Sequence, residues 1–374
     1  MVLGALARLR THAAQSRGRR YPEAPHPYRN EFQRDRDRII HTRAFRRLED
    51  KTQVFTAGIS DHFRNRLTHT IEVAQIARTV AAVLGLDEDL TEALALAHDI
   101  GHPPFAHAGE EELDRQMQRY GERFDHNLHS LRIVEQFEQR YARFPGLNLT
   151  FEVREGILKH SRDYAPGEHP IADEYLPGLK PVLEAQLIDL TDEIAYNTAD
   201  LDDGFSGGFF SFEDVRCEIP ELEELAATVD TQFPGASERL RFQELVRALI
   251  DVLVSGLIEG TQSACEGIRD AEQVRRQATR VAQFTPAAAE LNRALKNFLH
   301  RRLYHTPVLK EERRQAAVRI AELFSFLMNH PEHLPQGYEP NSEPLHWKVC
   351  DYIAGMTDGY FARSYERLLS AGRM

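Results

Sequence analysis

The chain has 374 residues, 42% of them hydrophobic, which is enough apolar material for a large buried core in one or two domains. Its 46 Lys and Arg against 58 Asp and Glu give a formal net charge of −12, which disfavours nucleic acid or an anionic membrane as the main partner. Three widely spaced cysteines predict neither a disulfide framework nor a thiolate zinc site, so a reducing cytoplasm fits best. Because no stretch approaches the ~20 apolar residues that cross a bilayer, we expect a globular protein without a membrane span.

The first 20 residues depart from this acidic balance, since they contain five arginines and no acid: Arg8, Arg10, Arg17, Arg19 and Arg20. A basic arm of this kind is found in nucleotide-binding segments, in transit-like leaders and in solvated tails. We favour the solvated tail and treat residues 1–27 as a basic N-terminal arm without an assigned function.

Most of the remaining chain predicts helices, because apolar residues recur at intervals of three and four. An all-α fold follows. One helix is expected from about Thr68 to Leu84, with His69 in its first turn. The next starts after Asp87 as N-cap and carries His98 on its apolar stripe, which turns that imidazole inward.

Two features of the middle of the chain bear on a site. Four prolines and two glycines between residues 161 and 181 predict a long loop that shapes a site rather than merely joining helices. The helix expected from about 182 to 201 has a second, polar face, and a glycine-rich break at 204–208 should end it. That polar face carries, at four-residue spacing, Ile188, Asp192, Tyr196 and Asp200.

A metal site is the strongest chemical prediction. His69, the adjacent pair His98 and Asp99, and Asp192 offer two imidazoles and two carboxylates, a mixed set that suits a divalent cation. The alternative is a hydrogen-bonded core histidine with acids that cap helices or form ion pairs. For the whole set in this order we favour the metal.

The stretch from His98 to Glu110 contains further histidines, His102 and His107, and suggests a reaction centre. His107 is a candidate proton donor because Glu110, three residues on, could hold its other nitrogen. His102 is expected to support the metal ligands. The alternative is a helix stop with solvent-facing histidines. His126 is a further candidate for contact with phosphate or water, with a surface loop as its alternative.

Basic side chains near these residues could bind phosphate. Arg66 lies three residues before His69 and could neutralise phosphate oxygens, unless it is an exposed arginine at a helix entry. Lys159 is a weaker candidate, and a solvated lysine is equally compatible with the sequence. No Walker loop, dinucleotide fingerprint or nucleophile elbow competes for the chemistry.

At these residues the chain resembles the HD superfamily of metal-dependent phosphohydrolases, named for the pair at His98 and Asp99. More specifically, it resembles the deoxyguanosinetriphosphate triphosphohydrolase-like family, over roughly residues 28–365. The motifs that carry this likeness are Arg34–His41, Phe45–Leu48, Lys51–Phe55, Arg66–His69, Leu295–Leu299 with Tyr304, and Asp351–Asp358. The resemblance implies an HD-type metal-dependent catalytic core at 28–215 and additional C-terminal helices at 216–374, packed on that core.

The family resemblance implies an activity, the hydrolysis of a deoxynucleoside triphosphate at the α-phosphorus to the deoxynucleoside and inorganic triphosphate. The implied metal ligands are His69, His98, Asp99 and Asp192. The implied catalytic residues are His107, Glu110 and His126. The implied substrate contacts are Gln53 to the 3′-hydroxyl, Arg66 to phosphate, and Tyr196 and Asp200 to the deoxyribose, with Lys159 as an added candidate.

Cofactor and partners follow from the same resemblance. We expect one divalent metal ion per subunit, with Mn, Mg, Fe and Co not distinguished, and Mg on the triphosphate as a further option. Deoxynucleoside triphosphates are the expected substrates, with activation by nucleotides and a homo-oligomer, a hexamer, as further expectations. The alternatives are a nucleoside monophosphatase or phosphodiesterase, a nuclease, and a non-catalytic nucleotide sensor. A sensor should have lost a ligand or His107, yet all are present.

Overall fold

The computed structural model describes residues 3–53, 63–336 and 343–370, and every regular element within them is helical. This confirms the predicted all-α fold. The extended pairings within these ranges are two isolated bridges, Arg19 with Thr150 and Thr52 with Asn65. In the same ranges, no helix combines the length and apolar character that a bilayer crossing requires.

The chain divides into two compact units, each assembled from three separate stretches of sequence. The first unit comprises residues 1–37, 71–96 and 150–306. The second comprises residues 38–70, 97–149 and 307–374.

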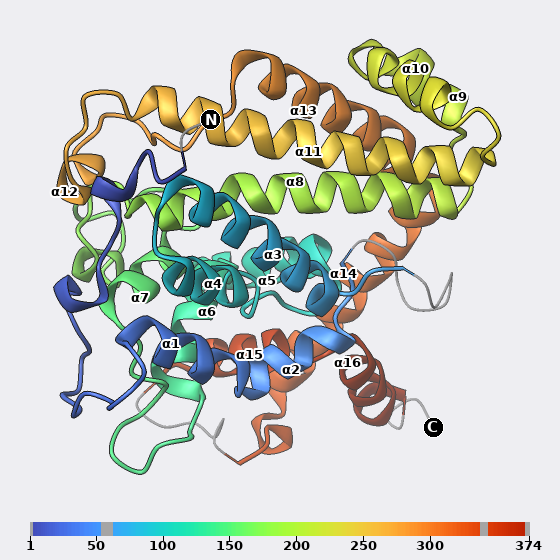
Figure 1. The fold of residues 1–374 in the computed structure, drawn as a ribbon. Coiled ribbons are helices and arrows are strands. Elements are labelled where there is room, and N and C mark those ends of the chain that lie inside the picture. The colour runs from blue at the N-terminus through green and yellow to red at the C-terminus, as the bar shows by residue number, and fades with distance from the viewer. Residues whose placement is uncertain (1–2, 54–62, 337–342, 371–374) are drawn as a thin grey trace. The chain divides into compact units, whose positions relative to one another are not determined.

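The first unit is organised around a long helix, α8 (Leu183–Ser206), which packs against α11 (Glu238–Ala264) and α13 (Pro286–Leu299) (Figure 1). Leucines at four-residue intervals on α11, from Leu245 to Leu257, are fully buried. Gly256 brings α13 close, because a Cβ there would lie 2.3 Å from the Cβ of Ala288. The other helices with most of their residues in this unit are η1 (Ala7–Leu9), η2 (Ala13–Gln15), α1 (Glu31–Ile40), α3 (Arg66–Leu84), α4 (Glu88–Ala97), α7 (Phe151–Leu158), η5 (Ala172–Glu174), α9 (Phe212–Glu218), η6 (Pro220–Leu222), α10 (Glu223–Gln232), α12 (Ala271–Arg275) and η7 (His300–Tyr304).

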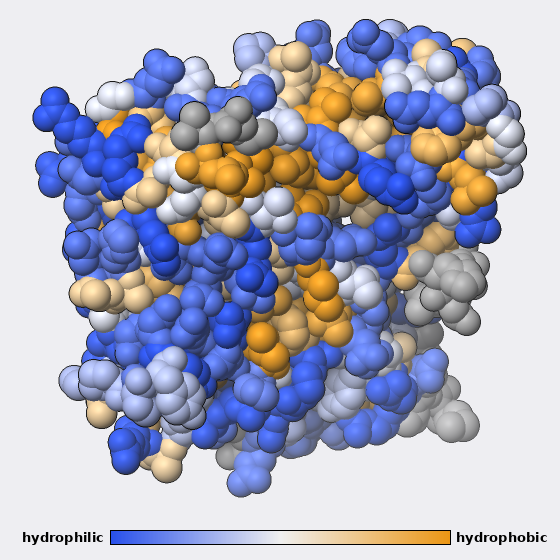
Figure 2. Space-filling view, viewed as in Figure 1, coloured by the Kyte–Doolittle hydropathy of each residue, from blue (hydrophilic) through white to orange (hydrophobic). Residues whose placement is uncertain are grey.

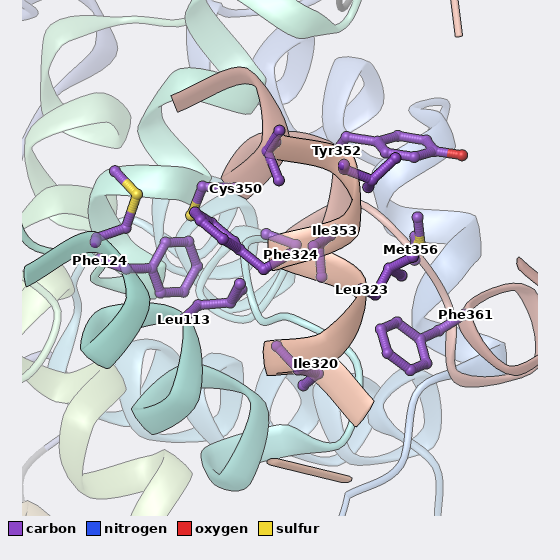
Figure 3. Packing of buried hydrophobic residues seen from close by; sticks show 14 of the residues in the cluster. Leu113, Phe124, Ile320, Leu323, Phe324, Cys350, Tyr352, Ile353, Met356 and Phe361 are labelled. Carbon is purple, nitrogen blue, oxygen red and sulfur yellow. The ribbon is translucent and has the colours of Figure 1, made fainter. Parts of the chain in front are cut away.

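The second unit has α14 (Pro307–Asn329) packed against α5 (Ala106–Gln118) and α15 (Leu345–Ala354). Its core joins Leu113 of α5, Phe324 of α14 and Ile353 of α15 in one buried cluster (Figure 3). The other helices of this unit are α2 (Arg43–Arg47), η3 (Leu48–Asp50), α6 (His126–Arg132), η4 (Ile133–Phe137), η8 (Pro331–His333), α16 (Asp358–Tyr365) and η9 (Glu366–Ser370). The cluster fixes α5, the helix that carries His107 and Glu110.

The ends of α3 and α4 confirm the helices predicted around the histidines. Gly85 follows α3 with φ +82°, a conformation that glycine adopts without strain. Asp87 caps α4, since its Oδ1 accepts a hydrogen bond from the backbone N–H of Leu90 at 3.0 Å. Because α4 ends at Ala97, His98 and Asp99 lie just beyond it, and His98 is buried as predicted.

The helix predicted over 182–201 is confirmed as α8, but Gly204 does not end it. The helix continues to Ser206, and a Cβ at Gly204 would lie 2.6 Å from the ring of Phe210. Gly204 therefore makes room for an aromatic ring. Gly208, with φ +73°, lies where the chain leaves the helix.

The interpretation of the first 20 residues as a solvated tail is wrong. Leu9 is fully buried, and Thr11 donates hydrogen bonds from its backbone N–H and its hydroxyl to the buried carboxyl group of Glu184, both at 2.8 Å. The guanidinium of Arg19 forms ion pairs with Glu31 at 2.6 Å and with Asp35. The arm is therefore part of the first unit. Glu184, the partner of Thr11, lies 173 residues along the chain, so local composition gives no sign of this contact.

Replacing Thr11 by Val keeps the shape of the side chain but removes one donor to Glu184. A hydrogen bond to a buried carboxyl group contributes about 1–3 kcal/mol, so we expect the free energy of unfolding to fall by that amount. Chemical denaturation measures the change. The control is Arg20→Ala, which removes a solvent-exposed ion pair with Glu174 and should cost no more than about 1 kcal/mol. Equal effects of the two substitutions would contradict the anchored arm.

Candidate metal centre

Three of the four predicted metal ligands come together in the second unit. Asp99 Oδ1 lies 3.3 Å from His98 Nε2, and Asp99 Oδ2 lies 3.9 Å from His69 Nε2. One potential ligand atom from each residue lies within 4.8 Å of the others, and all three residues are buried. The local structure explains this placement, because His69 is in the first turn of α3 and the pair follows the end of α4.

The donor chemistry of this group fits a divalent cation. Two imidazoles and an ionised carboxylate suit first-row metals and Mg²⁺. Burial raises the pKa of the Asp99 carboxyl group, but the charges of His98 and Arg66 outweigh burial and hold that pKa well below its usual range. Asp99 is therefore an anion inside the protein, the state that a metal ligand needs.

Arg66 supplies part of the compensating charge. Its Nη1 donates to Asp99 Oδ2 at 2.5 Å, and both side chains are almost fully buried. The alternative of an exposed arginine at a helix entry is therefore wrong. The predicted contact of Arg66 with phosphate stays a prediction.

The fourth predicted ligand, Asp192, lies on α8 of the first unit. Its Oδ2 is 3.9 Å from His160 Nε2, and His160 Nδ1 is 2.8 Å from Asp189 Oδ1. Asp189 in turn forms an ion pair with Arg280. Arg280, Asp189 and His160 therefore form a series of charged and polar side chains that ends at Asp192. His160 was not predicted, although it is an imidazole directly next to the candidate residue Lys159. Coordination by Asp192 stays a prediction.

A second group in the second unit consists of His102, Glu110 and His126, whose potential ligand atoms also lie within 4.8 Å of one another. Glu110 Oε1 lies 2.7 Å from His126 Nδ1 and accepts the backbone N–H of His126 at 3.0 Å. The rings of His102 and His126 lie against one another, with 3.8 Å between centroids and a tilt of 31° between the ring planes. Because His102 Nδ1 is 3.1 Å from Asp99 Oδ1, this group contacts the candidate metal ligands directly.

Glu110 lies between two histidines rather than beside one. The sequence analysis paired it with His107, whose Nδ1 is 3.8 Å from Glu110 Oε2, while the closer contact is to His126. Burial raises the pKa of Glu110, but the interactions with His107 and His126 lower it far below its usual range. The carboxylate is therefore ionised and can orient either imidazole. The side chain of His107 is 77% exposed, which leaves it accessible to a ligand from solvent.

The turn between α4 and α5 is built to hold these histidines. A Cβ at Gly101 would lie 2.2 Å from the carbonyl oxygen of His126, so only glycine fits here. This close approach brings His102 against His126. Because His102 is buried, the alternative of a mere helix stop with solvent-facing histidines is wrong for this residue.

The predicted substrate residue Gln53 lies in the second unit, at the edge of the described residues. Its side chain is half-buried, and its Oε1 is buried without a hydrogen-bond partner within the described part of the chain. A buried amide oxygen usually has a donor, so this atom is suited to accept one from a ligand. The rest of its motif, Val54 and Phe55, lies outside the described residues.

Lys159 has a structural environment in the first unit. Its ammonium group donates to Glu155 Oε1 at 3.0 Å and to the carbonyl oxygens of Leu176 and Leu179, both at 2.9 Å. These three acceptors match the three hydrogens of an ammonium group and fasten the 161–181 loop to α7. The solvated alternative is wrong, and the geometry favours a structural role over a phosphate contact.

Tyr196 and Asp200 occupy one face of α8, as predicted. Tyr196 is half-buried, and burial together with the charge of Glu193 raises the pKa of its phenol to about 12. Asp200 is buried and accepts a hydrogen bond from the hydroxyl of Tyr304. The sequence analysis included Tyr304 in a motif but gave it no partner, because 104 residues separate it from Asp200.

Metal binding is testable with Asp99→Asn, which replaces the anionic ligand by a neutral amide of the same shape. We expect the affinity for Mn²⁺ to fall by roughly two orders of magnitude or more, since even residues that only support ligands change affinity 10–100-fold. Metal content after dialysis against a defined Mn²⁺ concentration is the measurement. The control is Asp50→Asn, at an exposed carboxylate of the same unit. Equal metal content in both variants would rule out coordination by Asp99.

The close packing of Gly101 against the backbone of His126 predicts that Gly101→Ala destabilises the protein. The new methyl group must displace the backbone of α6, and overpacking of this kind costs about 1–3 kcal/mol. Thermal or chemical unfolding measures the loss. Gly235→Ala is the matched control, because a Cβ there meets no atom within 4 Å. A stable Gly101→Ala variant would show that the turn is less tightly packed than described.

The chain matches the HD domain over residues 66–197 and the phosphohydrolase-associated domain over residues 282–367. A deoxyguanosinetriphosphate triphosphohydrolase-like protein of Azoarcus sp. is 46% identical over 374 residues, covering 99% of this chain and 98% of that protein. Proteins of the same name from Geobacter metallireducens and Ralstonia nicotianae are 44% and 45% identical, covering 97% and 98% of this chain and 94% and 95% of their own lengths. The chain therefore belongs to the deoxyguanosinetriphosphate triphosphohydrolase-like family of HD-domain phosphohydrolases, as its motifs predicted.

Proposed function

We propose that this protein hydrolyses deoxynucleoside triphosphates to the deoxynucleoside and inorganic triphosphate, and so acts in nucleotide metabolism. The proposal rests on the contact between two groups of the second unit, one buried and one partly buried. Asp99, beside His69 and His98, lies 3.1 Å from His102, whose ring lies against that of His126 next to Glu110. A cation bound at the first group and proton transfer at the second would be adjacent, as hydrolysis of a phosphate ester requires. Membership of the family supports the class of substrate.

The proposed metal ligands are His69, His98, Asp99 and Asp192. When bound, a divalent cation supplies a Lewis acid that polarises a phosphate oxygen and makes water a better nucleophile. The ion pair with Arg66 keeps Asp99 ionised and in place. Two imidazoles and two carboxylates accommodate Mn²⁺, Mg²⁺, Fe²⁺ and Co²⁺, so the donor set is compatible with each of them.

We assign proton transfer to the histidines around Glu110. The oxygen of water forms a bond to the α-phosphorus and releases a proton to solvent, while the bond to O5′ breaks and O5′ needs a proton to leave as a hydroxyl group. We assign this proton to His107, the exposed imidazole, with the Glu110 carboxylate holding its Nδ1 side. His126, fixed by Glu110 at 2.7 Å, is positioned to donate to a phosphate oxygen.

We assign recognition of the sugar to Gln53, Tyr196 and Asp200. The buried Oε1 of Gln53 is suited to accept a hydrogen bond from the 3′-hydroxyl. The ring of Tyr196 would pack against the deoxyribose and leave no room for a 2′-hydroxyl, with Asp200 beside it on α8. Arg66 is the proposed phosphate contact, and such a local positive charge is needed in a protein of net charge −12. Lys159 supports the site only through the 161–181 loop.

The family resemblance extends the proposal to assembly and regulation. We propose a homo-oligomer, a hexamer, whose activity responds to deoxynucleoside triphosphates. Hydrophobic side chains gather over α11 and α13 in Figure 2, and Leu240 and Val252 of α11 are 59% and 37% exposed. Exposed apolar surface of this kind favours association between subunits.

The assay that tests the activity gives the purified protein each of the four deoxynucleoside triphosphates, singly and mixed, with Mn²⁺ or Mg²⁺, and separates products by ion exchange. We expect deoxynucleoside and triphosphate, and neither product with Asp99→Asn. Activity only in mixtures would indicate an activator site. Monophosphate with pyrophosphate would place the attack on another bond, and no turnover under any condition would favour a nucleotide sensor.

His107→Asn separates proton donation from metal binding. Loss of a general acid lowers kcat by roughly 10²–10⁴-fold, and we expect this loss with unchanged metal content. The matched control is His41→Asn, an exposed histidine of the same unit. Full activity of His107→Asn would transfer the proton donor to His126.

A further inference from the structure

The C-terminal motif of this chain ends in Asp358, whose carboxylate joins two segments of the second unit. Its Oδ2 accepts hydrogen bonds from the backbone N–H of Thr52, at 2.9 Å, and from the Thr52 hydroxyl. Its Oδ1 accepts the backbone N–H of Phe105 at 3.0 Å. Thr52 directly precedes Gln53, and Phe105 directly precedes α5 with His107. The side chain of Asp358 therefore binds both segments that carry residues of the proposed active site.

The residues around Asp358 contact the same two segments. The Gly355 carbonyl oxygen accepts a hydrogen bond from Arg47 Nη1 at 2.8 Å. The buried ammonium group of Lys51 donates to the carbonyl oxygen of His102 and, at 3.3 Å, to that of Ala354. Lys51 lies one residue before Thr52. Residues 354–358, which we term the C-terminal clamp, therefore bind the chain on both sides of the site.

The segment that Asp358 Oδ1 holds, Phe105 and Ala106, needs contacts that restrain its backbone. Phe105 and Ala106 have φ of +63° and +53°, the left-handed region that L side chains occupy only where their surroundings enforce it. Phe105 is also the N-cap of α5 and provides no side-chain cap. Its ring packs edge-on against Phe361 at 5.1 Å, and Phe361 is fully buried in the cluster of Figure 3. The direction of α5, and so the place of His107, depends on these contacts.

We propose that Asp358 is a positioning residue for the reaction, which fixes the Gln53 segment relative to the start of α5 through its hydrogen bonds to Thr52 and Phe105. This inference rests on the proposed function. Asp358 touches no substrate; it acts through the two segments it holds. Its carboxylate suits this task because all three donors need an acceptor, which an amide in its place cannot provide on both sides.

The experiment compares Asp358→Asn, Thr52→Val and the control Glu366→Gln, which makes the same charge change at an exposed carboxylate of the neighbouring η9. The substrates are the best deoxynucleoside triphosphate and its 2′,3′-dideoxy counterpart. We expect kcat/KM of Asp358→Asn to fall by roughly 10–100-fold, because small displacements of positioned groups cost this much. Thr52→Val disturbs only the Gln53 segment. It should raise KM with little change in kcat and reduce the preference for the 3′-hydroxyl. Glu366→Gln should match the wild type.

Two further readouts separate positioning from loss of structure. Amide hydrogen exchange should quicken at Thr52 and Phe105 in Asp358→Asn, while metal content stays at the wild-type level. In a double-mutant cycle, Asp358→Asn and Gln53→Ala should raise KM by less than the product of their separate effects.

The proposal is overturned if Asp358→Asn keeps wild-type kcat/KM and preference for the 3′-hydroxyl. It is also overturned if activity falls only in proportion to lost metal or lost folded protein. Failure of the proposed function has a different signature, because then the wild-type protein itself would release no triphosphate from any substrate.

Discussion

The site depends on the cost of burying one negative charge, that of Asp99. A carboxylate removed from water is stable only with compensating charge and hydrogen bonds, and here Arg66 donates at 2.5 Å while His98 and His102 lie within 3.3 Å. These partners come from α3, from the end of α4 and from the turn that follows. A divalent cation would strengthen the same arrangement, because it adds positive charge where the protein has gathered oxygen and nitrogen ligands.

The second unit shows how distant parts of the chain serve this one site. The turn from Gly101 to Ala106 leaves α4, passes against α6 and enters α5 through two strained residues. The core cluster of α5, α14, α15 and α16 fixes α5 from one side, and Asp358 holds Phe105, the residue directly before α5. The phosphohydrolase-associated match at 282–367 covers most of these C-terminal helices. We interpret this region as the support that holds Glu110 and His107 in place beside the candidate metal ligands.

The sequence predicted those structural features that depend on residues close to one another along the chain. Helical periodicity located α3, α4 and α8, because helices form from contacts three and four residues apart. Gly85 marked the end of α3, and Asp87 marked the start of α4. The grouping of His69, His98 and Asp99 followed from motif and helix ends. The contact of Glu110 with His126, the anchoring of Thr11 on Glu184 and the clamp at Asp358 join residues far apart in sequence, so no periodicity reveals them. The predicted end of α8 at Gly204 was wrong for a related reason. In the sequence, a glycine that makes room for an aromatic ring cannot be distinguished from a glycine that ends a helix.

Hydrolysis at the α-phosphorus is tested by turnover in H₂¹⁸O, followed by mass spectrometry of both products. Attack of water on the α-phosphorus places one ¹⁸O in the inorganic triphosphate and none in the deoxynucleoside, and this is the result we predict. Label in pyrophosphate, in a nucleoside monophosphate or in the 5′-hydroxyl of the deoxynucleoside would contradict it, since each means that a different bond was broken.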